Sequence, residues 1–149
     1  HLSLRRQRQM CIRDRDGPSV TQVEAAILRF ARAGLRVHIT ELDLDVLPQV
    51  SDYTGADIST NYKYAKKLNP YTAGLPESIE AQHTKRYTEL FELFVKHRDK
   101  IDRISTWGTT DGESWKNGWP IKGRTNYPLL FDRQYKPKKA YFAIKNIKS

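Results

Sequence analysis

The order helix, short stop, strand occurs twice in this chain, and this repeat limits the possible fold more than any other feature. The first unit covers residues 19–42 and the second covers residues 78–109. Helices that alternate with strands are typical of α/β proteins, in which the strands of a sheet run parallel. The sequence therefore predicts an α/β fold. Two parallel strands leave both sheet edges unpaired, so we expect the rest of the sheet to come from outside this chain.

The first unit carries signals for both ends of its helix. Ser19 can cap the helix, and Gln22 three residues later completes a capping box. Apolar residues at helical spacing follow, and they are Val23, Ile27, Phe30 and Ala31. Gly34 supplies the left-handed residue that commonly ends a helix. The strand is expected directly afterwards, over residues 35–42.

The second unit follows a long stretch, residues 48–76, that is rich in Asn, Thr, Ser, Tyr, Gly and Pro. A loop of this length is typical of a functional segment rather than a plain connector. The helix of the unit is expected over residues 78–97 and its strand over residues 101–109. A last helix can begin at Pro137. Its inward-facing residues are predicted to be Ala140, Tyr141, Ile144 and Ile147.

The composition changes abruptly at the dipeptide Gly17-Pro18. Residues 1–17 hold five Arg and two Asp, together with Cys11, the only cysteine of the chain. We interpret this basic tract as foreign to the domain or disordered, and we assign the domain to residues 18–149. A single cysteine excludes an internal disulfide framework and a cysteine-based metal cage.

The net charge of +9 raises the question of a nucleic-acid partner. Much of this charge lies in the leading tract and near the other end, without a basic stripe that has interleaved aromatic residues. A basic nucleic-acid binder is therefore the less favoured class. A run of 18 apolar residues is also lacking, which argues against a membrane partner. The chain begins with His rather than Met, and we expect it to be incomplete.

The strand sequence VHITELDLDV, residues 37–46, becomes acidic towards its end. Strict alternation of side chains predicts that one face carries Val37, Ile39, Glu41 and Asp43. Charge on a face that begins apolar must be paired, hydrated or used. Three interpretations stay open: a solvated or helix-capping pair, a Mg²⁺ or Ca²⁺ site that includes Asp45, or glycoside chemistry with a second carboxylic acid.

Three tryptophans, Trp107, Trp115 and Trp119, lie within thirteen positions of one another. Each can fill a hydrophobic core. However, an indole in a loop of Gly, Asn, Ser and Lys is hard to bury, and its flat apolar face with a polar edge suits a sugar ring. The carboxyl ends of the strands are also where α/β barrels place their active sites. Together these features favour a carbohydrate ligand.

Three blocks of sequence occur in the order GLRVHITELDLDVLP, STWGTTDGESW and YPLLFDRQYKPKKAYFAI. They resemble the C-terminal portion of the family ten glycoside hydrolases, the endo-1,4-β-xylanases, from about Pro18 to the end of the chain. The resemblance implies an incomplete (β/α)8 TIM barrel, about strands seven and eight with their helices. A complete barrel needs about 250 residues. The resemblance implies no metal and no cofactor.

The resemblance also implies roles for individual residues. Glu41 matches the catalytic nucleophile, and Asp43 matches a supporting residue that helps to hold a histidine against it. Trp107 and Trp115 match the tryptophans of the sugar subsite beside the cleavage point. The implied reaction is retaining double displacement at internal β-1,4 bonds of xylan or xylo-oligosaccharides.

The acid/base Glu of the family has no match, because the Asn-Glu dipeptide that carries it does not occur in these 149 residues. We therefore expect this chain alone to be inactive. The family further implies a secreted or extracytoplasmic protein, and no signal peptide is recognisable in the chain. The alternative function is a non-catalytic carbohydrate-binding module that uses Trp107, Trp115 and Trp119. The sequence does not predict an oligomeric state.

Overall fold

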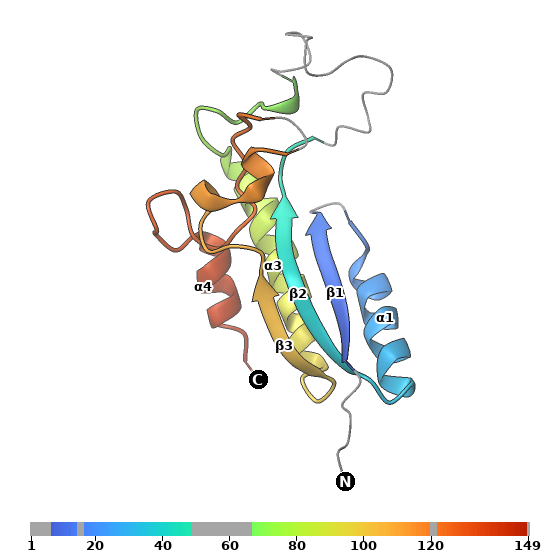
Figure 1. Cartoon of the computed structure of the whole chain (residues 1–149). Coiled ribbons are helices and arrows are strands. Elements are labelled where there is room, and N and C mark those ends of the chain that lie inside the picture. The colour runs from blue at the N-terminus through green and yellow to red at the C-terminus, as the bar shows by residue number, and fades with distance from the viewer. Residues whose placement is uncertain (1–6, 15–16, 49–66, 120–121, 149) are drawn as a thin grey trace.

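A computed structural model describes residues 7–14, 17–48, 67–119 and 122–148 of the chain (Figure 1). Within these residues the strands are β1 (Gln7–Asp14), β2 (Arg36–Asp45) and β3 (Ile101–Thr106). The helices are α1 (Val20–Arg32), α3 (Glu77–Lys96) and α4 (Lys139–Lys145), with the short 3-10 helices η2 (Asp111–Glu113) and η3 (Trp115–Asn117) between β3 and α4. From α1 onwards the helices and strands follow the predicted order, whereas β1 before them was not predicted. Most of the predicted loop over residues 48–76 lies outside the described residues.

The three strands form one parallel sheet in the order β1-β2-β3, so their carboxyl ends meet at the same edge (Figure 1). Sequence analysis predicted β2 and β3, although β2 extends further and β3 ends earlier than expected. Residues of α1, α3 and α4 join those of β2 in a single hydrophobic core. The described part of the chain is therefore an α/β unit with β2 at its centre.

Strand β1 was not predicted, and it lies in the tract that we interpreted as foreign or disordered. The structure differs from the expected disorder, because residues 7–14 run parallel to β2. A parallel neighbour satisfies backbone N–H and carbonyl groups that β2 would otherwise leave unpaired at this edge. The foreign origin of residues 1–17 stays a prediction.

Helix α1 begins as the sequence predicts. The Ser19 hydroxyl accepts a hydrogen bond from the backbone N–H of Gln22 at 3.2 Å, and the Gln22 side chain accepts one from the backbone N–H of Ser19 at 2.8 Å. Gly34 follows the end of the helix with a φ of 73°, which is the left-handed conformation that glycine adopts without strain. None of the described helices is long and apolar enough to cross a membrane.

Strand β2 contains an extra residue near its middle. Ile39 pairs with Met10 of β1, and the next pair along the two strands is Glu41 with Cys11, which leaves Thr40 as the extra residue. The pairing of β2 with β3 is irregular over the same stretch. Such a β-bulge shifts the alternation of side chains by one position, so residues beyond it exchange faces.

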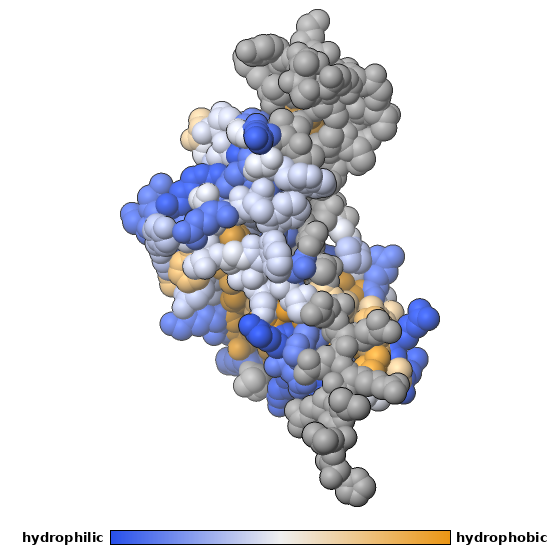
Figure 2. All heavy atoms as spheres, in the orientation of Figure 1, coloured by the Kyte–Doolittle hydropathy of each residue, from blue (hydrophilic) through white to orange (hydrophobic). Residues whose placement is uncertain are grey.

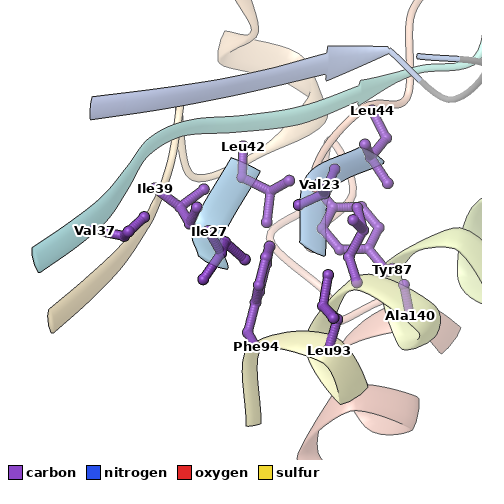
Figure 3. Packing of buried hydrophobic residues seen from close by; sticks show 11 residues of the cluster. Val23, Ile27, Val37, Ile39, Leu42, Leu44, Tyr87, Leu93, Phe94 and Ala140 are labelled. Carbon is purple, nitrogen blue, oxygen red and sulfur yellow. The ribbon is translucent and has the colours of Figure 1, made fainter. Parts of the chain in front are cut away.

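The bulge places the apolar side chains from both halves of β2 on the same face of the sheet. Val37 and Ile39 before the bulge are fully buried, as are Leu42 and Leu44 after it (Figure 3). The helices contribute the remaining buried residues of this core, which are Val23, Ile27, Tyr87, Leu90, Leu93, Phe94 and Ala140. Continuous burial on one face therefore holds β2 against α1 and α3.

The predicted strict alternation is wrong beyond Thr40. Leu42 packs against the helices rather than away from them. Because neighbouring side chains of a strand point to opposite faces, Glu41, Asp43 and Asp45 lie on the face turned away from the helices. The acidic end of the strand therefore does not interrupt the core face, which stays apolar along its whole length.

The free edge of β3 lies beside an apolar groove. Within the described residues β3 pairs with β2 alone. The groove, of about 200 Å³, lies between α3 and β3, and its apolar lining residues are Phe91, Phe94, Val95, Ile101 and Ile104. Figure 2 shows a band of hydrophobic residues between α4 and β3, and a second group of hydrophobic residues near α1. An open edge beside an apolar groove agrees with the expectation that the sheet continues outside this chain.

Candidate active site

The carboxyl end of β2 lies next to the segment that follows β3. Trp107, the first residue after β3, donates its backbone N–H to the carbonyl oxygen of Leu42 at 3.3 Å. The short helices η2 and η3 follow in the chain and lie beside the tip of β2 in Figure 1. The predicted site residues Glu41 and Trp107 therefore belong to the same end of the sheet.

Asp43 and Trp115, two further predicted site residues, are in direct contact. Asp43 is fully buried, and its Oδ2 atom accepts a hydrogen bond from the indole Nε1–H of Trp115 at 2.8 Å. A hydrogen bond from an indole to a carboxylate fixes the orientation of the ring. The structure thus adds an indole contact to the supporting role that we expected for Asp43.

Lys116 connects the carboxylates of β2 with the loop after β3. Its side chain is buried, with its Nζ atom 3.4 Å from Oδ2 of Asp45 and 3.8 Å from Oδ1 of Asp43. The same Nζ atom lies 5.2 Å from the centre of the Trp115 ring. A buried ammonium group between carboxylates offsets their charge and makes their burial possible. Sequence analysis missed Lys116, because a lysine in a polar loop gives no signal of burial.

The carboxylate of Asp45 accepts hydrogen bonds from two other groups of the chain. Its Oδ1 atom accepts hydrogen bonds from the backbone N–H of Leu47 at 2.9 Å and from the side-chain amide of Asn126 at 2.8 Å. Asn126 was also missed, since it lies 81 residues further along the chain. No group of three or more His, Cys, Asp or Glu residues in the described part of the chain is arranged to hold a metal ion. The structure therefore gives no support to the Mg²⁺ or Ca²⁺ interpretation.

Glu41 differs from the other two carboxylates in its accessibility. It is half-buried, with its Oε2 atom shielded from solvent, whereas Asp43 and Asp45 are buried. The three side chains share the face of β2 that is turned away from the helices. Glu41 is thus the least buried carboxylate of this row.

The three tryptophans also differ in how much of their surface is exposed. Trp115 is half-buried, but Trp107 is 47% exposed and Trp119 is 61% exposed. The ring centres of Trp115 and Trp119 are 5.4 Å apart, with an angle of 35° between the ring planes. The site therefore combines one anchored indole with two indoles that keep a large part of their surface open.

A second buried ion pair fixes the loop that carries Trp115. Oδ2 of Asp111 lies 3.0 Å from Nζ of Lys138, and both residues are buried. Oδ1 of Asp111 accepts a hydrogen bond from the backbone N–H of Leu129 at 2.9 Å. Burial raises the pKa of the Asp111 carboxyl and lowers the pKa of Lys138, because it disfavours the charged form of each group. The ion pair connects η2 with the start of α4.

Several known proteins similar to this chain are endo-1,4-beta-xylanases. The model of glycosyl hydrolase family 10 matches residues 7–147. The endo-1,4-beta-xylanase A of Xylanibacter ruminicola is 46% identical over 121 residues, which cover 81% of this chain and 33% of that protein. An endo-1,4-beta-xylanase of Geobacillus stearothermophilus is 34% identical over 130 residues, or 87% of this chain and 34% of that protein.

A solved structure shows the same likeness in three dimensions. The structure of a GH10 endoxylanase retrieved from a sugarcane soil metagenome matches with a TM-score of 0.82 and 48% sequence identity, over 93% of this chain and 38% of that one. The likeness implies that the three-stranded unit is a piece of a (β/α)8 barrel. The chain spans about a third of the length of the curated relatives that it matches.

Proposed function

Because the chain belongs to glycosyl hydrolase family 10, we propose that it is part of an endo-1,4-β-xylanase in which Glu41 is the catalytic nucleophile. The complete protein, meaning the full-length polypeptide that contains this chain, cuts internal β-1,4 bonds of xylan or xylo-oligosaccharides. The chain contributes about strands seven and eight of the barrel with their helices, and β1 takes the position of the strand before them.

The observation that carries this proposal is the bulge at Thr40. It keeps the core face of β2 apolar while it turns Glu41 to the face away from the helices. In a barrel this face is the interior, and the carboxyl ends of the strands are where substrates bind. Partial exposure leaves Glu41 open to attack a substrate, while the buried Asp43 holds Trp115 beside it.

The proposed reaction is a double displacement. The ionised Glu41 attacks C1 of a xylose unit, and the bond from C1 to the leaving oxygen breaks while a second carboxylic acid donates its proton to that oxygen. A glycosyl ester with Glu41 results. The second carboxylate then takes a proton from water, which attacks C1, releases the sugar and restores both groups. The two carboxyl groups of such an enzyme lie about 5–5.5 Å apart.

The second carboxylic acid comes from a part of the complete protein that this chain does not include. We therefore propose that residues 1–149 alone do not hydrolyse xylan, because loss of one of two catalytic groups removes orders of magnitude in rate.

The exposed faces of Trp107 and Trp115 bind the sugar next to the cleaved bond. We also propose that the complete protein acts outside the cytoplasm, since polymeric xylan does not cross membranes.

Hydrolysis of linear xylan tests this function. The complete protein should release new reducing ends and lower the viscosity of the solution early, as expected for cuts inside the polymer. The chain of residues 1–149, assayed alone, should release none. A complete protein that binds xylan but never releases reducing ends would contradict the proposal and favour a carbohydrate-binding module, which the exposed surfaces of Trp107 and Trp119 would then serve.

A further inference from the structure

We infer that Trp119 is a further sugar-binding residue, which takes a xylose ring one unit away from the ring that reacts at Glu41. This inference rests on the proposed function and deepens it. It makes Trp119 a determinant of how strongly the protein prefers long xylo-oligosaccharides to short ones.

The exposure of Trp119 is the first observation. With 61% of its surface open, Trp119 is among the most exposed large hydrophobic residues of the described chain. It follows Gly118, the residue that caps the end of η3 and whose backbone N–H donates a hydrogen bond to the carbonyl oxygen of Trp115 at 3.0 Å. A large indole that stays open to water at a fixed place on a polar surface is typical of a binding residue.

The contact between Trp119 and Trp115 is the second observation. Their ring centres are 5.4 Å apart, within the range in which aromatic rings attract each other. The tilt of 35° turns the two ring planes in different directions. Consecutive rings of a β-1,4-linked chain are also not coplanar, and the separation of the indoles is comparable with the length of one sugar unit. The open face of Trp119 therefore lies one ring beyond the anchored Trp115, where a sugar unit next to the reacting one can stack.

Trp115 gives this pair a rigid base. Its indole is bonded to Asp43, and the ammonium group of Lys116 lies over its ring. Asp43 is fully buried in β2, two residues beyond Glu41. A row of residues therefore leads from Glu41 to the surface of the protein. It consists of Asp43 on the same face of β2, the anchored Trp115, and the exposed Trp119.

The chemistry of xylose fits such a residue. A xylose ring in a chain carries no hydroxymethyl group at C5, so its C–H bonds form apolar faces on both sides. These faces stack on an indole, while the hydroxyl groups at the rim of the ring stay in water. A bulky substituent on this unit would lift the sugar from the indole, so Trp119 favours an undecorated unit at this position.

Calorimetric titration of the complete protein with linear xylo-oligosaccharides tests the inference, in a Glu41→Gln background that keeps the ligand intact. Trp119→Ala should weaken the binding of the longer oligosaccharides about five- to tenfold, as expected for the loss of one aromatic stacking contact. Trp119→Phe should restore most of this affinity. The ratio of affinities for long and short oligosaccharides should fall in the alanine variant.

A matched control is Phe142→Ala, which removes another exposed aromatic side chain, on α4, and should leave the affinities unchanged. Equal binding of all lengths with and without Trp119 would overturn this inference alone. A lower melting temperature with unchanged affinity would also overturn it, because Trp119 would then pack against the rest of the protein. Failure of the protein with Trp119 intact to bind any xylo-oligosaccharide would overturn the proposed function as well.

Discussion

Replacement of Glu41 by glutamine in the complete protein is expected to lower the turnover of xylan on the order of 10³-fold or more. Glutamine fills nearly the same volume as glutamate and keeps a polar head group, so the fold of β2 should not change. Its neutral amide, however, cannot form the ester with C1 that the proposed reaction requires. The expected loss lies in kcat, whereas KM should change little, because binding of the sugar rests on the tryptophans.

The rate of reducing-end release at saturating xylan measures this effect. Glu92→Gln is a suitable control, since it makes the same chemical change at an exposed position on α3. The control should retain full turnover. Near-equal turnover by the Glu41→Gln variant and the unmodified protein would remove Glu41 from the mechanism.

Replacement of Lys138 by methionine is expected to lower the free energy of unfolding by about 3–5 kcal/mol. Methionine has a similar length, but it leaves the buried Asp111 carboxylate without its ammonium partner. The Lys138 ammonium also donates hydrogen bonds to the carbonyl oxygens of Tyr127 at 2.9 Å and Leu129 at 2.7 Å. The variant would lose these bonds too, so the segment before α4 should become less stable.

The pH dependence separates this mechanism from a simple loss of packing. Burial already raises the pKa of Asp111, and removal of Lys138 takes away the charge that opposes this rise. A carboxyl group whose pKa is higher in the folded state stabilises the fold below its unfolded pKa of about 3.9, and this contribution is lost as the pH rises through the folded value. The two lost hydrogen bonds lower the stability of the variant at every pH, so its stability deficit should be smallest near pH 4 and should grow towards neutral pH.

Denaturant unfolding of the complete protein at several pH values measures this deficit. Lys139→Met is the matched control, because Lys139 is exposed and forms ion pairs with Glu80 at 3.0 Å and Glu77 at 3.5 Å on the surface. Exposed pairs contribute roughly 0–1 kcal/mol, so the control should stay close to the unmodified protein. A deficit in Lys138→Met that is equal at all pH values would contradict the ion-pair explanation.

Local sequence signals predicted much of the fold correctly. The capping box of Ser19 and Gln22 and the glycine stop at Gly34 are found where expected, because they depend only on residues within a few positions of one another. Helix α3 was predicted within one residue at each end. Helix α4 is shorter than the predicted segment, and of its four expected inward residues only Ala140 is fully buried.

Features that depend on neighbouring strands could not be predicted in this way. The bulge at Thr40 follows from the pairing of β2 with β1, and a strand sequence alone shows only its own alternation. Strand β1 likewise forms because the edge of β2 is available. The sequence therefore identified the acidic strand end correctly but assigned Glu41 and Asp43 to the face that carries the core.

The candidate site was likewise predicted only in part, because some of its residues depend on contacts between distant parts of the chain. Its carboxylates and tryptophans were found because their residue types suit sugar chemistry. The buried lysines were missed, since Lys116 and Asp45 are 71 residues apart and only the folded chain brings them together. A lysine becomes a core residue only where distant carboxylates offset its charge.

Trapping of the glycosyl ester tests the assignment of Glu41 most directly. A xylobioside with fluorine in place of its C2 hydroxyl and with a good leaving group should form the ester and hydrolyse it slowly. Mass spectrometry of the complete protein should then find one added glycosyl group in the tryptic peptide of residues 37–63, with fragment ions that place it on Glu41. A label on a different carboxylate, or release of product with inverted configuration and no label, would contradict the account.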